Sequence, residues 1–317
     1  MSELITDVKS LEIETLNNLK NSKASNTLRA YQSDFKDFSS FCAKNSFSSM
    51  PTQPKIIALY ITNLSKISKF STLKRRIASI SVIHKLKGHY LDIKHPIIME
   101  NLHGIKRTLG SRQKAKKPLL INDLKKIIKA IDEEKKSAKN HVESKVKSKI
   151  KLRNKALILI GFAGGFRRSE LVNIEKEDVD FVSEGVKILI KRSKTDQSGE
   201  GIIKAIPYFE NKEFCPVTAF KNYTKNKLTN NKNDKIFNIS DKSVALIIKK
   251  YAEKAGLDSS KYAGHSLRSG FATTAAEFGA EERNIMAMTG HKTTQMVRRY
   301  IQEANLFKNN ALNKIKI

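Results

Sequence analysis

The stretch that decides the fold runs from Gly264 to Ala304 and reads GHSLRSGFATTAAEFGAEERNIMAMTGHKTTQMVRRYIQEA. Three glycines divide it. Gly264 precedes a helical run, Gly279 ends that run in the position of a C-terminal cap, and Gly290 closes a second short helix. The threonines that follow are suited to cap a third helix. The stretch therefore predicts three short helices separated by tight turns.

Four side chains in this stretch are chemically distinctive. His265 and Arg268 are three residues apart and share a helix face, His291 follows a glycine, and Tyr300 comes nine residues later. A guanidinium matches a phosphate bidentately, an imidazole donates or takes a proton near neutral pH, and a phenol becomes a nucleophile when a base and cations assist it. Each motif alone is more typical of a surface ion pair or a core residue. Their order predicts attack of Tyr300 on a phosphodiester.

This order resembles the catalytic domain of the tyrosine recombinases, the phage integrase family. Its members carry a first arginine in a G-[LF]-R-x-S-E-L box, a lysine on a β-hairpin, H-x-x-R, a His or Trp after Gly, and the nucleophilic Tyr. The run from Gly165 to Leu171, GFRRSEL, matches the box, and Lys194 in RSKTDQ matches the hairpin segment. The resemblance extends over nearly the whole chain from Ser25. It implies a mainly α fold with a small antiparallel β-sheet, of the DNA breaking-rejoining type.

The resemblance also implies a role for each matching residue. Arg167 and Arg268 would clasp the scissile phosphate, with Glu170 orienting the site. His265 would assist deprotonation of Tyr300, and His291 would donate a hydrogen bond to the phosphate. Lys194 would protonate the leaving 5′ oxygen as general acid. The product would be a 3′-phosphotyrosyl link, which stores the bond energy, so no cofactor and no metal is expected. Neither a P-loop nor an acidic metal-binding motif occurs in the sequence.

The composition favours a nucleic-acid partner. The chain of 317 residues holds 60 Lys and Arg against 31 Asp and Glu, a net charge of +29. A lysine-rich proteome with solvated basic faces is the alternative explanation. No apolar run approaches the eighteen or so residues of a membrane span, and the first residues do not resemble a secretory signal. Cys42 and Cys215 fit no metal or disulfide pattern. These features predict a cytoplasmic, nucleoid-associated protein.

Changes in composition along the chain predict its division into domains. A cationic stretch without hydrophobic periodicity, TLGSRQKAKKP, separates two parts that each hold helical patterns. The part before it resembles the core-binding domain of the family, a SAM-like bundle of four or five helices. The predicted organisation is a helical extension at 1–24, a core-binding helical domain at 25–107, a basic linker at 108–118 and a catalytic domain at 119–317.

Several boundaries inside the catalytic domain are also predicted. Asn122 is the expected cap of the first helix, and an apolar helix is expected to start at Lys151. Residues 132–151 are rich in Lys and Glu; they are helical by propensity, hold few apolar residues and are interpreted as an exposed insertion. β-branched runs at 180–182, 185–191 and 202–207 predict the antiparallel sheet.

Basic residues outside the catalytic set are candidate DNA contacts. A solvated or surface role is the alternative for each of them, and phosphate contacts of this kind give salt-dependent affinity without sequence information. The candidates are Lys74, Arg75, Arg76, Arg168, Lys191 and Arg192, with Lys204 as a further phosphate contact.

The predicted function is a site-specific DNA recombinase, acting in integration, excision or resolution. Its predicted partners are double-stranded DNA and further copies of itself, in a homotetramer or as paired protomers. A type IB topoisomerase, which rejoins the original strand, would use the same residues. A DNA-binding protein without catalysis is the alternative from another class. The DNA site, the accessory factors and whether Tyr300 cuts in cis or in trans are left open.

Overall fold

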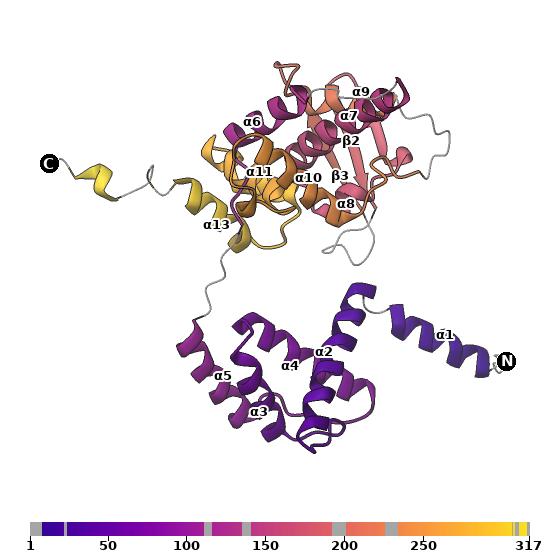
Figure 1. Cartoon of the computed structure of the whole chain (residues 1–317), viewed down its shortest axis with the longest axis vertical. Coiled ribbons are helices and arrows are strands. Elements are labelled where there is room, and N and C mark those ends of the chain that lie inside the picture. Colours follow the sequence, from indigo (N-terminus) through magenta and orange to yellow (C-terminus); the bar gives the residue numbers. More distant parts are fainter. Residues whose placement is uncertain are drawn as a thin grey trace, which may run out of the picture. The chain divides into compact units, whose positions relative to one another are not determined.

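The structure is a computed structural model that describes residues 8–21, 24–110, 116–134, 141–191, 201–225, 234–305, 307 and 311–315. The chain divides into two compact units, Met1–Lys114 and Ala115–Ile317 (Figure 1). The expected fold class, mainly α with a small antiparallel sheet, is confirmed. No helix among these residues is long and apolar enough to cross a membrane.

The first unit is helical throughout its described part. Its helices are α1 (Val8–Asn21), α2 (Ser25–Lys44), α3 (Pro54–Ser65), α4 (Phe70–Leu86) and α5 (Pro96–Leu109). The helices α2 to α5 pack around one core, to which α2 contributes Phe38 and α3 contributes Ile57, Tyr60 and Ile61. Prolines at Pro54 and Pro96 begin α3 and α5, because a proline at the first helical position lacks only a donor that has no helical partner.

The second unit combines helices with one three-stranded sheet. Its elements are α6 (Ile121–Asp132), α7 (His141–Ala163), α8 (Arg168–Val172), η1 (Lys176–Asp178), β1 (Val179–Phe181), β2 (Gly185–Ile190), β3 (Ile202–Pro207), α9 (Pro216–Lys225), α10 (Asp241–Lys254), η2 (Ser259–Lys261), α11 (Ser266–Glu277), α12 (Glu282–Thr289), α13 (Thr294–Asn305) and η3 (Ala311–Lys314). The strands are antiparallel in the order β1-β2-β3, and Ile188 pairs with Val179 on one side and Lys204 on the other.

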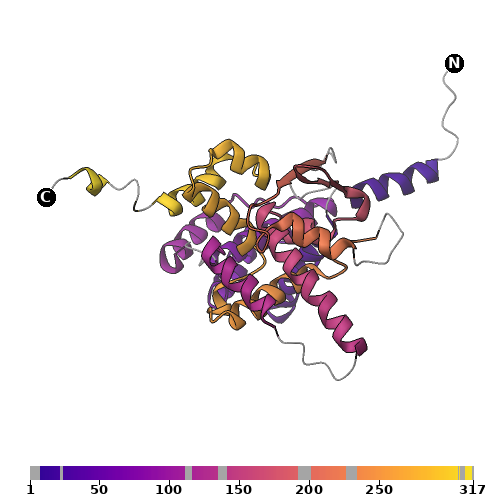
Figure 2. The same cartoon turned by 90° about the horizontal axis from the view of Figure 1, so that it is seen from above.

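Two predicted boundaries in this unit are wrong. Helix α7 begins at His141, ten residues before Lys151, because lysines and glutamates are good helix formers even where little is buried. In Figure 2 its first turns extend away from the rest of the unit. The N-cap position of helix α6 is Leu120, not Asn122, and no side chain caps the helix. Just before it, the backbone N–H of Leu119 bonds the Ser266 carbonyl at 2.9 Å, which holds this end of the helix against α11.

Close contacts hold helix α11 in place on two sides, against the segment before α6 and against α7. A Cβ atom at Gly270 would lie 2.0 Å from the Leu119 carbonyl oxygen, so the helix backbone touches the strand-like segment before α6. On α7, a Cβ atom at Gly161 would meet the Leu267 side chain at 2.8 Å. These glycines allow helix backbones to approach closely. They fix the position of Arg268, which α11 carries.

Candidate active site

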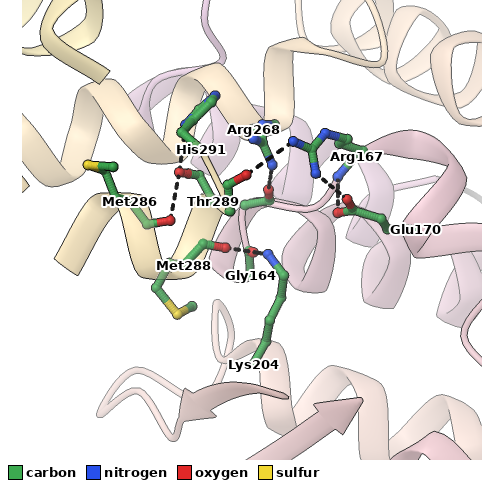
Figure 3. A network of polar contacts seen from close by, with 11 residues as sticks. Gly164, Arg167, Glu170, Lys204, Arg268, Met286, Met288, Thr289 and His291 are labelled. Carbon is green, nitrogen blue, oxygen red and sulfur yellow. Dashed lines mark hydrogen bonds and ion pairs between the residues drawn. The ribbon is translucent and has the colours of Figure 1, made fainter. Parts of the chain in front are cut away.

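The loop between α7 and α8 positions the first arginine. Gly165 has φ +55°, a conformation that favours glycine, and the chain turns there into Arg167, the N-cap residue of α8. The carboxylate of Glu170 accepts the backbone N–H of Arg167 at 2.9 Å and its Nη1 at 2.5 Å (Figure 3). Glu170 is buried, so this pair holds the guanidinium in one orientation.

Arg268 reaches the same loop from α11. Its side chain is 2% exposed, and Nη1 donates to the Gly165 carbonyl at 3.1 Å. Nη2 is buried without a hydrogen-bond partner among the described residues. Burial, together with the charge of Arg167, lowers the pKa of Arg268 to about 10, so the group remains cationic at neutral pH. A buried cation with an unpaired donor is costly unless an anion satisfies it, which a phosphate oxygen would do.

The turn after α12 connects the arginines to the second imidazole. Gly290 is left-handed, with φ +62°, and its carbonyl accepts Nη2 of Arg167 at 3.2 Å. His291 follows, with Nδ1 2.7 Å from the hydroxyl of Thr289. Thr289, Gly290 and His291 are consecutive in the chain. The hydrogen bond from Arg167 to the Gly290 carbonyl therefore also orients the imidazole of His291.

Tyr300 lies beside that imidazole. Helix α13 carries it, and the ring centroids of His291 and Tyr300 are 5.9 Å apart. The tyrosine is half-buried against a small cluster that includes Ala272, Ile285 and Val297. Its phenol is also close enough to Arg268 to act on the pKa of that guanidinium. The structure thus brings Arg167, Arg268, His291 and Tyr300 together.

The electric field at the site is strongly positive. Burial first, and then Arg268, Arg167, His265 and Lys204, lower the pKa of His291 to about 4. The imidazole is therefore neutral at pH 7. His265 is exposed at the N-cap of α11, and it is among the groups that lower the pKa of His291. Such a field attracts an anion and disfavours any further cation.

Lys204 is a buried member of this group and differs from what its sequence context predicted. The residue is 4% exposed, and its ammonium donates to the Gly164 carbonyl at 2.7 Å and to the Met288 carbonyl (Figure 3). It also lies 4.7 Å from the centroid of the Phe166 ring. Burial lowers its pKa to about 8. A phosphate contact was expected, but Lys204 instead connects the α7–α8 loop to the end of α12.

A sequence signal for this burial exists. Residues two apart on a strand share a face, so Lys204 lies on the same side of β3 as the buried Ile206. The alternation of buried and exposed residues along β3 does not show which polar groups the ammonium of Lys204 contacts on the buried side. The two carbonyls come from residues 40 and 84 positions away.

The other predicted residues lie elsewhere or are paired with acids. Lys194 and Arg192 fall outside the described residues. The ammonium of Lys191 contacts Glu175, Glu177 and Asp178, which raise its pKa. Neutralised by these carboxylates, Lys191 adds little to the attraction of a phosphate.

In the first unit, α4 presents the predicted basic string in two different ways. Arg75 forms an ion pair with Asp34, and Arg76 pairs with Asp37 and donates to the hydroxyl of Tyr60 at 2.8 Å. Lys74 is exposed. The carboxylates would compete with DNA for both guanidinium groups, so Lys74 is the strongest candidate for a phosphate contact in this string.

Arg168 keeps part of its charge available. Its side chain packs across the backbone of Gly264: a Cβ atom added to that glycine would lie 1.9 Å from Cδ of Arg168. The Arg168 side chain is 41% exposed. Its guanidinium is 3.9 Å from the carboxylate of Asp241, a distance at which the pair is weak. It therefore remains a candidate contact to the DNA backbone next to His265.

Known proteins are similar to this chain in sequence. The profile of the phage integrase family matches residues 119–306, more than half of the chain. The integrase/recombinase xerD homolog of Selenomonas ruminantium is 40% identical over 318 residues, which cover 96% of this chain and 89% of that protein. The tyrosine recombinase XerC of Staphylococcus aureus is 25% identical over 92% of this chain and 91% of its own.

Solved structures share the fold. The XerH site-specific recombinase in a post-cleavage complex with palindromic difH has a TM-score of 0.59 at 17% identity, covering 82% of this chain and 73% of its own. A lambda integrase dimer bound to a COC' core site has a TM-score of 0.58 at 16% identity, covering 99% and 100%. At these identities the likeness concerns the fold.

Proposed function

Because the chain belongs to the phage integrase family, the tyrosine recombinases, it is a site-specific recombinase that cleaves and rejoins DNA, and we propose that Tyr300 is its nucleophile. The observation that carries this assignment is the convergence of two arginines and an imidazole beside one phenol. Arg167 donates to the Gly290 carbonyl and Arg268 donates to the Gly165 carbonyl. The ring centroids of His291 and Tyr300 are 5.9 Å apart.

The two guanidinium groups would bind the non-bridging oxygens of the scissile phosphate. Glu170 holds Arg167 in place through two hydrogen bonds, and the unpartnered Nη2 of Arg268 supplies a donor for the phosphate. Fixed cations at this point stabilise the negative charge that develops as the phosphorus becomes five-coordinate. Because they are already oriented, little reorganisation is needed during the reaction.

The covalent step exchanges one phosphate ester for another. The Tyr300 oxygen attacks phosphorus as its proton leaves with assistance from His265, and the bond from phosphorus to the 5′ oxygen breaks. Lys194, which lies outside the described residues, is proposed to protonate that oxygen as general acid. His291 is proposed to hydrogen-bond the phosphate. A 3′-phosphotyrosyl link results, and attack by a 5′-hydroxyl reverses the step. Because ester bonds are conserved, the step requires neither ATP nor a metal ion.

The partners proposed for this reaction are double-stranded DNA and further copies of the chain. The net charge of +29 supports binding of a polyanion, and XerH and lambda integrase have been solved on DNA. Exchange of two duplexes requires four cleavages, so we propose a homotetramer acting in two pairs. We assign the helical domain that starts at residue 25 to core binding, the basic linker predicted at 108–118 to joining the two units, and residues 119–317 to catalysis. The predicted start of the linker is two residues early, because α5 continues to Leu109. Lys74 and Arg168 are the favoured backbone contacts.

Replacement of Tyr300 tests the proposal directly. The Tyr300→Phe protein should form no covalent adduct with a nicked suicide duplex that carries the DNA flanking the gene, whereas its affinity for that duplex should stay within a few-fold. Denaturing gels detect the adduct, and gel shifts measure the affinity. Tyr262→Phe is a matched control, since the Tyr262 hydroxyl donates to Asp123, which is not one of the proposed site residues, and its loss should leave adduct formation intact. Adducts formed by Tyr300→Phe would refute the assignment.

A further inference from the structure

The hydroxyl of Thr289 makes two short contacts. Thr289 is the last residue of α12, and its side chain is fully buried. Its oxygen lies 2.6 Å from the Ile285 carbonyl oxygen and 2.7 Å from Nδ1 of His291. A third, much weaker contact reaches the Met286 carbonyl at 3.5 Å (Figure 3). The two short distances are typical of good hydrogen bonds, and each requires one proton between its atoms.

Counting protons assigns them. A hydroxyl carries one proton, and a carbonyl oxygen carries none. The proton between Thr289 and Ile285 therefore belongs to the threonine, which can then meet His291 only as an acceptor. The proton of that second contact must come from Nδ1 of the imidazole. If the threonine instead donated its proton to Nδ1 of His291, a lone pair of its hydroxyl oxygen would face a lone pair of the Ile285 carbonyl oxygen at 2.6 Å. Such an arrangement is costly in a buried position.

We propose that Thr289 is a positioning residue that holds neutral His291 in the Nδ1–H tautomer and leaves a lone pair on Nε2. A phosphate oxygen is also an acceptor. His291 in this tautomer can therefore donate to a phosphate only after Nε2 takes up a proton. Phosphate binding and protonation of His291 are thus coupled, a consequence that rests on the proposed function.

The charges around His291 support this coupling. The groups that face it come from the loop before α8, from β3, from α11 and from α13: Arg167, Lys204, His265, Arg268 and Tyr300. The cations among them, together with burial, keep the imidazole neutral at pH 7. An anion bound among the same cations offsets their field and raises the pKa of His291, which favours uptake of the proton.

Nitrogen NMR of the full chain reads the tautomer directly. With histidines labelled with ¹⁵N in the ring, protonated and unprotonated ring nitrogens have well-separated chemical shifts. The chain has seven histidines, and loss of one set of signals in His291→Gln identifies that residue. At pH 7 in the wild type we expect a protonated Nδ1 and an unprotonated Nε2. Thr289→Val, which removes the hydroxyl at similar shape, should shift His291 to the Nε2–H form that imidazole favours in water.

Two further measurements separate positioning from a general structural effect. Thr289→Ser restores the hydroxyl and should keep the Nδ1–H tautomer, so the proposal stays testable even if the valine variant does not fold. Inorganic phosphate should raise the pKa of His291 by about one unit or more in the wild type. The spectra also report His265, whose signals serve as an internal comparison.

The outcomes that overturn the proposal are equally direct. A wild-type Nε2–H tautomer, or an unchanged tautomer in a folded Thr289→Val protein, contradicts the role of Thr289. A His291 pKa that does not respond to phosphate contradicts the coupling. Since the tautomer measurement needs neither DNA nor cleavage, its failure is distinguishable from failure of Tyr300 as nucleophile.

Discussion

Single residues at this site act through a few buried polar contacts. Glu170 is 5% exposed, and both of its oxygens are occupied by Arg167. Lys204 has no carboxylate partner in the described parts of the chain and depends on two carbonyls. Removing one member of such a contact leaves the other buried and unsatisfied, which costs more than the contact itself contributes.

Replacement of Glu170 should therefore destabilise the folded protein. We expect Glu170→Ala to lower the free energy of unfolding by about 3 kcal/mol, because the partly buried guanidinium of Arg167, whose side chain is 16% exposed, loses its counter-ion. Urea unfolding followed by circular dichroism measures the change. Glu177→Ala is the matched control: this carboxylate pairs with Lys191 at the surface, and its loss should cost less than about 1 kcal/mol. Equal costs for the two variants would contradict the structural role of Glu170.

Burial of Lys204 predicts a pH dependence of stability. Its pKa is about 8 in the folded protein and 10.5 when unperturbed. Between these values the unfolded chain holds a proton that the folded chain has released, so stability rises with pH in this window and is flat below it. Relative to Lys204→Met, the wild type should gain between about 1 and 3 kcal/mol from pH 8 to 10.5. Unfolding free energies across this range measure the gain, and Lys74→Met should show no such trend.

At the scale of elements, the site depends on where α11 and α12 end and what they touch. Helix α11 carries Arg268 and contacts α7, α12 and α13, so a displacement of α11 moves the arginine relative to His291 and Tyr300. The turn at Gly290 joins α12 to His291. Contacts between helix backbones therefore control the geometry of the groups proposed to bind the phosphate.

Gly270→Ala tests this dependence. The added methyl group would lie 2.0 Å from the Leu119 carbonyl oxygen, which is backbone and cannot rotate away. We expect a loss of about 3 kcal/mol in the free energy of unfolding and a loss of DNA cleavage. Gly104→Ala in α5 is the control, since nothing lies within 4 Å of the added atom and the helix should gain about 0.5 to 1 kcal/mol. A neutral Gly270→Ala protein would show that α11 is not held in this way.

At the scale of the whole molecule, the balance of charge governs association with DNA. The net charge is +29, but the structure divides the cations into those that acids neutralise and those that face solvent. Only the second kind releases counterions when a phosphate is bound. The salt dependence of binding therefore measures how many cations are available, which is fewer than the composition suggests.

DNA affinity should consequently fall about 10³-fold or more between about 50 and 200 mM salt. Fluorescence anisotropy with a labelled duplex in the Tyr300→Phe background measures the slope without cleavage. Lys74→Gln should reduce the magnitude of the slope by about one. Lys191→Gln should leave it nearly unchanged, because three carboxylates already neutralise that ammonium. If both variants change the slope equally, pairing with acids does not decide which cations bind DNA.

The sequence by itself determined the family, the fold class and the order of the catalytic residue types. Glycine and threonine positions predict the helices around Arg268 and Tyr300 because turns and caps depend on neighbouring residues, and the observed α11, α12 and α13 agree. The predicted start of α6 at Asn122 was wrong, and there the chain makes a contact between residues far apart in the sequence, from Leu119 to Ser266.

Only the tertiary structure decided which polar groups meet. The carbonyl partners of Lys204, the carboxylate partners of Arg76 and the meeting of Arg167 with Gly290 all join residues far apart in the chain. Even the contact of Thr289 with His291, two residues on, depends on the left-handed turn between them. The physical reason is that a side chain's charge and tautomer are set by burial and by its neighbours in space, and periodicity along the chain specifies neither.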